Sequence, residues 1–112
     1  MNDIKELNTE SFEEFIEHDQ PVFVDFWAEW CSPCRQVEPE IEAVAKTRND
    51  FSFGKLNTDA NADVAAAYDI RAIPTFAVFQ DGQEIMRYSG VLREKQLNEF
   101  LDQAISLSRE GA

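Results

Sequence analysis

The sequence lacks the patterns that mark membrane, exported and repetitive proteins. No apolar run approaches the roughly 20 residues of a transmembrane helix, and no repeat, linker or low-complexity segment is visible. The N-terminal stretch MNDIKE lacks the basic and then apolar pattern of a signal peptide. The 112 residues suffice for one domain, and nine phenylalanines supply bulky side chains for its core. We therefore expect a single cytoplasmic domain over residues 1–112.

Basic side chains are also scarce. Ten Lys and Arg stand against 22 Asp and Glu, which gives a formal net charge of −12. Nucleic-acid binding needs a basic face, and anionic membranes repel an acidic chain, so both partners are disfavoured. Three interpretations of the charge remain open: a surface that repels its own copies, a basic docking partner, and adaptation to high salt.

Cysteine and histidine are nearly absent as well. The chain has two cysteines and a single histidine, His18. A structural zinc ion takes four ligands, and His18 is predicted near the end of a helix that holds neither cysteine. Only a dimer could complete such a site, so we predict no metal. In a cytoplasmic protein, a cysteine pair is more typical of catalysis or metal binding than of a structural disulfide.

Both cysteines lie in one short segment, Cys31-Ser32-Pro33-Cys34, between a predicted buried strand over 22–27 and a helical pattern. Unsatisfied N–H groups and about half a positive charge at a helix N-terminus favour a thiolate. They can lower a cysteine pKa from about 8.5 to ~3.5–7.5. The thiolate is the attacking species in disulfide exchange. Cys31 is better placed for attack, whereas Cys34 can form a disulfide with it but is shielded by the helix.

Hydrophobic periodicity predicts alternating strands and helices. Strands are expected over 4–7 (an edge strand within 1–7), 22–27, 51–57, 75–79 and 84–89. Helices are expected after a cap at Asn8 or Thr9, and over 32–48, 62–68 and 93–107, with a tail over 108–112. This order is typical of an α/β fold with parallel crossovers first, an antiparallel hairpin at Asp81-Gly82, and helices on both faces of one sheet. Gly90 predicts a bulge.

Two residues break their local pattern. Asp25 interrupts the apolar run of its strand, where an ionised carboxylate is costly unless it is paired. Its pKa should be raised, which makes it a general-base candidate near a thiol, although a satisfied polar group of the core is the alternative. Pro39 lies inside the helix over 32–48, removes the hydrogen bond to the carbonyl of Arg35, and should kink the helix.

Together these residues resemble the thioredoxin family over nearly the whole chain. The resemblance rests on residues 24–31 (VDFWAEWC), Pro33-Cys34, Pro39, Lys55, Ile73-Pro74-Thr75, Asp81-Gly82 and Gly90. Ser32 departs from the family motif, which has glycine there, and Ala72 stands where glycine is common. The resemblance implies the thioredoxin fold, a mixed five-stranded sheet flanked by four helices in three αβα layers.

The resemblance also implies an activity, thiol–disulfide exchange that reduces protein disulfides. Cys31 would attack the substrate disulfide, and Cys34 would resolve the mixed disulfide and leave a Cys31–Cys34 disulfide. Asp25 would accept the Cys34 proton, and Lys55 would pair with Asp25 and tune it. No cofactor besides the redox-active disulfide is implied.

A substrate surface is implied around the two sulfurs. Ile73-Pro74 is predicted to be a cis peptide, and the backbone of Ile73 would pair with an extended substrate by strand addition. Trp27 would pack beneath this surface. Pro39 would have a structural role and would not contact the substrate. The predicted docking residues are Trp30, Ser32, Pro33, Ile73, Pro74, Gly90 and Val91.

The implied partners are disulfide-containing proteins and a thioredoxin reductase, flavin- and NADPH-dependent by family expectation, with a ferredoxin-linked donor still open. A monomer is expected. Two alternatives remain: a disulfide isomerase or oxidase with the same fold, and a binding module whose redox chemistry is incidental. The first is disfavoured by the absence of a signal peptide and of a histidine between the cysteines.

Overall fold

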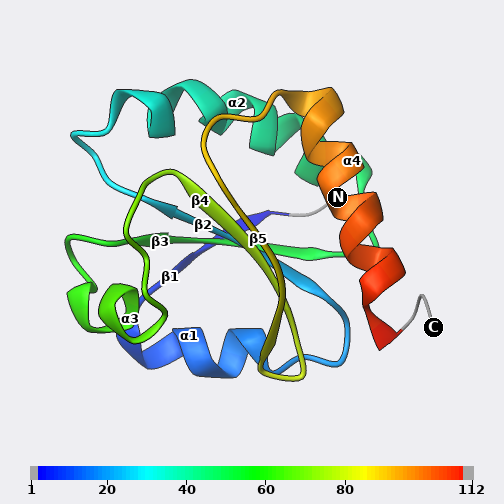
Figure 1. Ribbon diagram of the computed structural model, residues 1–112, viewed down its shortest axis with the longest axis horizontal. Coiled ribbons are helices and arrows are strands. Elements are labelled where there is room, and N and C mark those ends of the chain that lie inside the picture. The colour runs from blue at the N-terminus through cyan, green and yellow to red at the C-terminus, as the bar shows by residue number, and fades with distance from the viewer. Residues whose placement is uncertain (1–2, 110–112) are drawn as a thin grey trace.

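The computed structural model describes residues 3–109, in which strands and helices alternate as predicted (Figure 1). Residues 1–2 of the predicted edge strand and 110–112 of the predicted tail lie outside the described residues. The strands are β1 (Ile4–Leu7), β2 (Val22–Trp27), β3 (Ser52–Asn57), β4 (Thr75–Gln80) and β5 (Gln83–Ser89). The helices are α1 (Thr9–Ile16), α2 (Ser32–Thr47), α3 (Ala62–Ala67) and α4 (Glu94–Leu107).

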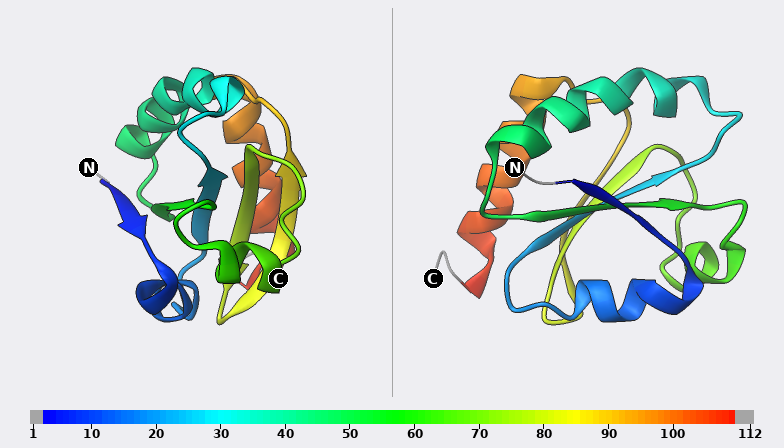
Figure 2. Two further views of the ribbon diagram at one scale, coloured as in Figure 1. Left: turned by 90° about the vertical axis from the view of Figure 1, so that its left-hand side faces the viewer. Right: turned by 180° about the vertical axis from the view of Figure 1, so that it is seen from behind.

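The strands form one mixed five-stranded sheet in the order β1-β3-β2-β4-β5. Strands β1 and β2 both pair with β3 in parallel, whereas β4 is antiparallel to β2 and to β5. Figure 2 shows the short β1 and the long β5 at opposite edges. The predicted parallel first part and antiparallel end are confirmed. The central strand β2 therefore ends between two neighbours, where the segment with the cysteines begins.

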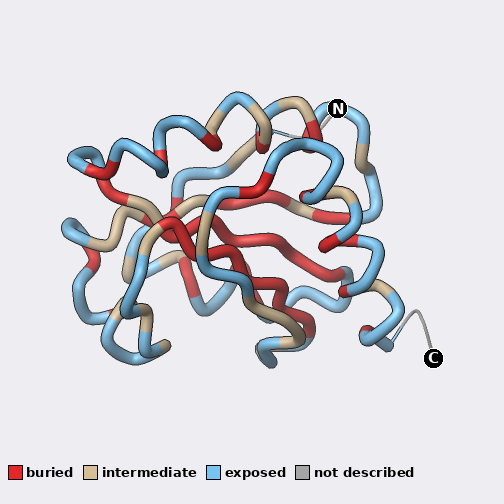
Figure 3. Tube along the Cα trace, turned by 45° about the horizontal axis from the view of Figure 1, so that its top comes forward, coloured by how far each residue is buried: buried red, intermediate tan, exposed pale blue. Residues whose placement is uncertain are grey.

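Helices cover both faces of the sheet, which gives three layers. Helices α2 and α4 pack on one face, and α1 and α3 pack on the other (Figure 1). Alternate residues of β2 enter the two cores: Phe23 packs with α2 and α4, and Val24 packs with α1. A strand buried on both faces needs apolar residues at every position, which explains the apolar run on both sides of Asp25. Figure 3 shows this buried centre beneath exposed loops.

The ends of two elements follow local backbone chemistry. Asn8 caps α1, because its side-chain oxygen accepts the N–H of Ser11 at 2.9 Å and the Ser11 hydroxyl accepts the N–H of Asn8 at 3.0 Å. The β4–β5 hairpin turns at Asp81 (φ 53°) and Gly82 (φ 81°), both in the left-handed region that a tight two-residue turn requires. The predicted cap and hairpin are confirmed.

One predicted irregularity is in the wrong place. The ladder between β4 and β5 shifts register between Val78 and Phe79, so that Val78 pairs with Met86 and Phe79 pairs with Glu84. Gly90 is not this bulge: it follows the last residue of β5 and adopts φ 129°, a conformation open mainly to glycine. The prediction failed because glycine marks a special φ value and does not say whether the ladder continues past it.

Helix α2 runs without interruption through Pro39. The kink expected at this proline stays a prediction. Within residues 3–109, no helix combines the length and the apolar character needed to cross a bilayer.

Candidate active site

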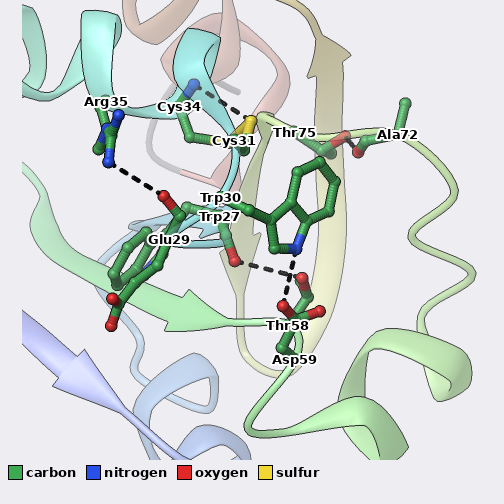
Figure 4. The surroundings of a disulfide bond; sticks show 10 residues. All are labelled: Trp27, Glu29, Trp30, Cys31, Cys34, Arg35, Thr58, Asp59, Ala72 and Thr75. Carbon is green, nitrogen blue, oxygen red and sulfur yellow. Dashed lines mark hydrogen bonds between the residues drawn. A yellow bond between two sulfur atoms is a disulfide. The ribbon is translucent and has the colours of Figure 1, made fainter.

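The two cysteines form a disulfide at the start of α2 (Figure 4). Cys31 is the N-cap residue, Cys34 lies in the first turn, and their Cα atoms are 5.2 Å apart. The backbone N–H of Cys34 donates a hydrogen bond to the Cys31 sulfur at 3.2 Å. The Cys31 sulfur therefore occupies the place of a capping oxygen, where helix N–H groups stabilise negative charge.

Burial alone does not separate the two sulfurs. In the disulfide, Cys31 is 3% exposed and Cys34 is 2% exposed. Both pack with Ala28, and the partly buried Trp27 and Ile73 lie against this small cluster. The predicted shielding of Cys34 is present, but Cys31 is equally enclosed in this state. The difference between the two lies in their positions relative to the N-terminus of α2.

The segment between α3 and β4 is fixed beside the disulfide. The Ile73-Pro74 peptide is cis, as predicted. The Thr75 hydroxyl donates to the carbonyl of Ala72 at 2.5 Å (Figure 4). The N–H of Gly90 donates to the carbonyl of Pro74 at 2.9 Å. These bonds anchor both sides of the cis peptide, so Ile73 is held against the cysteine cluster.

The predicted docking residues differ in exposure. Trp30 is 70% exposed and Val91 is 42% exposed, and Ser32 and Pro33 are also exposed. Ile73 and Gly90 are half-buried, and Pro74 is buried. Trp30 and Val91 are therefore accessible to solvent, whereas Pro74 is enclosed. Trp27 lies beneath the disulfide as expected, and its buried indole N–H has no hydrogen-bond partner among residues 3–109.

Asp25 is a buried carboxyl group in the middle of β2. It is only 4% exposed, and its Oδ1 atom has no hydrogen-bond partner in the described part of the chain. Burial raises the pKa of Asp25 from 3.8 to about 7, the positive charge of Lys55 lowers it, and the negative charge of Glu38 raises it. The predicted direction of the shift is confirmed. A group with a pKa near 7 can gain and lose a proton at neutral pH.

Lys55 lies directly across from Asp25 in the register between β2 and β3. Its ammonium group lies over the Trp27 ring, 5.1 Å from the ring centroid. Within residues 3–109, no ion pair closer than 4.0 Å joins Lys55 to Asp25. Lys55 therefore acts on Asp25 through its charge at a distance, while it also packs on Trp27 beneath the disulfide.

Comparison with known proteins agrees with this geometry. The thioredoxin family model matches residues 3–103. The chain belongs to the thioredoxin family. It is 41% identical to thioredoxin from Buchnera aphidicola subsp. Schizaphis graminum over 107 residues, which is 94% of this chain and 99% of that one. It is 42% identical to thioredoxin C-3 from Corynebacterium nephridii over 101 residues, 89% of this chain and 70% of the relative.

Solved thioredoxins share the fold. Thioredoxin from Malassezia sympodialis superposes with a TM-score of 0.85 at 28% identity, covering 93% of each chain. A mutant thioredoxin from Halobacterium salinarum gives a TM-score of 0.82 at 28% identity, covering 96% of this chain and 92% of the other. With its Cys31–Cys34 disulfide, this thioredoxin-family chain is a thiol–disulfide oxidoreductase that reduces protein disulfides.

Two residues of this thioredoxin site were missed by the sequence analysis. The Trp30 indole N–H donates to the Asp59 carboxylate at 2.7 Å, which holds the exposed ring beside the disulfide (Figure 4). Glu38, half-buried on α2, influences the charge of Asp25. Glu38 lies four residues after Cys34, a spacing that places both on one side of a helix and could have identified it. Asp59 follows β3 at the edge where β2 also ends, which is a weaker signal.

Proposed function

We propose that Cys31 is the nucleophile and Cys34 the resolving cysteine of the reduction. In the dithiol form, the Cys31 thiolate attacks one sulfur of a substrate disulfide, and the other substrate sulfur leaves as a thiolate that takes a proton. Cys34 then loses its proton and attacks the Cys31 sulfur, which releases the second substrate thiol. Two electrons pass to the substrate, and the Cys31–Cys34 disulfide remains. The hydrogen bond from the Cys34 N–H to the Cys31 sulfur carries this assignment.

Asp25 is the proton acceptor for Cys34 in this proposal. Its burial and its pKa of about 7 support the role, because a base poised near neutral pH can accept a thiol proton and release it again. Lys55 tunes Asp25 by favouring the ionised carboxylate. Together, the Asp25 and Lys55 side chains set the pH at which the second step becomes fast.

The substrate is a protein disulfide in an extended segment. Trp30 and Val91 supply exposed apolar contact, with Ser32, Pro33 and Gly90 around the sulfurs, and the backbone of Ile73 pairs with the substrate strand. The cis peptide before Pro74 turns the backbone of Ile73 toward the substrate strand in this proposal. The hydrogen bonds on either side of this peptide support that arrangement.

The electron donor in this proposal is a flavin- and NADPH-dependent thioredoxin reductase, and the protein works as a cytoplasmic monomer. A cytoplasmic pool is reducing, which suits a dithiol that must be regenerated. The test combines the purified protein with such a reductase, NADPH and insulin. We expect NADPH oxidation that depends on insulin and stops with Cys31→Ser. Reactivation of scrambled ribonuclease, without turnover by the reductase, would instead establish the isomerase or oxidase alternative.

Ser32 is predicted to make the pair more oxidising. A hydrogen bond from its hydroxyl to the Cys31 thiolate would stabilise the reduced form by about 1 kcal/mol. Since 30 mV corresponds to about 1.4 kcal/mol, the wild-type potential should lie about 20 mV above that of Ser32→Gly. Equilibration of both proteins with dithiothreitol measures this difference, with Ser106→Gly as a control far from the sulfurs. An equal or lower wild-type potential would refute the hydrogen bond.

A further inference from the structure

A cavity of about 310 Å³ opens beside Asp25, between α2 and the β1–β3 side of the sheet. Neither cysteine is among its lining residues, so the cavity approaches Asp25 from a side other than the disulfide. Its walls carry charge from three elements. The lining residues are Asp3, Ile4, Asp25, Glu38, Ile41, Glu42, Ala45, Lys46 and Lys55.

The proposed reaction requires one proton to leave Asp25 in every turnover. Cys34 gives its proton to the carboxylate, and the neutral carboxyl must lose it before the next cycle. Asp25 is 4% exposed, and its Oδ1 atom has no hydrogen-bond partner within residues 3–109. No side chain or backbone group among these residues can therefore take the proton directly from that oxygen. The cavity is large enough for several waters, each of which takes about 30 Å³ in the liquid. Water in this cavity can therefore meet the buried carboxyl group.

We propose that Glu38 is the relay carboxylate that passes the Asp25 proton through this cavity to solvent. The inference rests on the proposed role of Asp25 as the proton acceptor. Neutral Asp25 donates its proton to a cavity water, that water gives a proton to the Glu38 carboxylate, and Glu38 releases it to bulk water. Charge balances at each step, because Asp25 becomes anionic as Glu38 becomes neutral. Glu38 therefore influences the redox step only through Asp25.

Placement singles out Glu38 among the charged residues of the cavity. Glu38 is half-buried, whereas Glu42, one turn further along α2, is exposed. Glu38 and Asp25 line the same cavity, and the negative charge of Glu38 raises the pKa of Asp25. The other charged residues of the lining are Lys55 on β3, Lys46 near the end of α2, and Asp3 before β1. Lys46 and Asp3 are exposed, so Lys55 and Glu38 are the enclosed charges next to Asp25.

The test isolates the step in which Cys34 loses its proton. Reduced protein is mixed rapidly with one equivalent of Ellman's reagent. The first thionitrobenzoate is released when Cys31 attacks, and the second when Cys34 displaces it from Cys31. The first-order rate of the second release is followed against pH for wild type and Glu38→Gln, with Glu42→Gln as the matched control on the same helix. Glu38→Asp tests rescue by a shorter carboxylate.

A relay and a purely electrostatic effect give different profiles. Below pH 7, where Asp25 starts protonated and must lose that proton first, loss of a relay should slow the second release of Glu38→Gln by about threefold to tenfold. This is less than the ~10²–10⁴-fold effect of a general base, because cavity water remains. Above pH 7, where Asp25 starts ionised, the rate should match that of wild type. Imidazole should restore the rate below pH 7, Glu38→Asp should retain most of it, and Glu42→Gln should match wild type. A Glu38→Gln profile that only moves to lower pH, or a loss that imidazole does not restore, overturns the relay.

Asp25→Asn separates this inference from the proposed function. If Asp25→Asn is slow and Glu38→Gln is normal, the relay is wrong and the base assignment stands. If Asp25→Asn releases the second thionitrobenzoate as fast as wild type, the base assignment itself is wrong. The first release should be unchanged in all these variants, which shows that each still folds and presents Cys31.

Discussion

Asp25→Asn is expected to gain about 4 kcal/mol of unfolding free energy relative to wild type as the pH rises from below 4 to above 7. The shift of the Asp25 pKa from 3.8 to about 7 is about three units, and each unit corresponds to ~1.36 kcal/mol. The physical reason is that an ionised carboxylate is poorly solvated in β2, whereas it is well solvated in the unfolded chain. The asparagine has nearly the same shape and does not ionise, so its own cost is independent of pH.

The sign follows from proton binding. Between pH 3.8 and about 7 the native protein keeps a proton on Asp25 that the unfolded chain has lost, so wild-type stability falls as pH rises. The contribution is fully present below the unfolded pKa and is lost as the pH passes through the native value. Urea unfolding of both oxidised proteins across this range, with m-values compared, measures the difference.

A second carboxylate provides a control of opposite sign. The Asp50 pKa is lowered, chiefly by hydrogen bonding to Arg48 at 2.8 Å. Its contribution is therefore present above the unfolded pKa and is lost as the pH falls. Asp50→Asn should show no growing advantage above pH 4. Parallel stability curves for wild type and Asp25→Asn would mean that Asp25 ionises as easily in the fold as in the unfolded chain.

The elements of this fold could be predicted because their signals are local. The apolar run of β2, the Asn8 cap and the Asp81-Gly82 turn each depend on neighbouring residues. Asp25 was also visible in the sequence, since a carboxylate inside such a run conflicts with its surroundings. The position of Cys31 at the helix N-terminus followed from the strand–helix boundary alone.

The features that the sequence analysis did not predict depend on register between segments that are distant in sequence. The shift at Val78 and Phe79 arises from how β5 meets β4, which no local pattern encodes. Asp59 reaches Trp30 across 29 positions because β2 and β3 end at the same edge of the sheet. Asp25 and Lys55 are likewise paired in the register of β2 and β3, but the Lys55 ammonium lies over the Trp27 ring. The register alone does not reveal where this side chain lies.

Cys34→Ser is expected to halt the reaction after its first step, while Cys31→Ser abolishes the reaction. Without Cys34, the Cys31 thiolate still attacks, but no thiol remains to displace the substrate, so a mixed disulfide accumulates at one substrate per protein. Without Cys31, the remaining thiol lies inside the first turn, away from the capping position that stabilises a thiolate. Non-reducing electrophoresis with a disulfide substrate, followed by mass spectrometry, measures the trapped species.

The double variant Cys31→Ser/Cys34→Ser serves as the control for non-covalent binding. It should retain the docking surface and trap nothing, whereas a binding module would keep full biological activity in this form. Multiple turnovers by Cys34→Ser, or trapping through Cys34 in Cys31→Ser, would reverse the two roles. In Cys34→Ser, the alkylation rate of Cys31 against pH should also give a pKa below the about 8.5 of a free cysteine. A lowered pKa is expected because the substitution leaves the backbone N–H of residue 34 in place. This N–H still donates to the Cys31 sulfur at the N-terminus of α2.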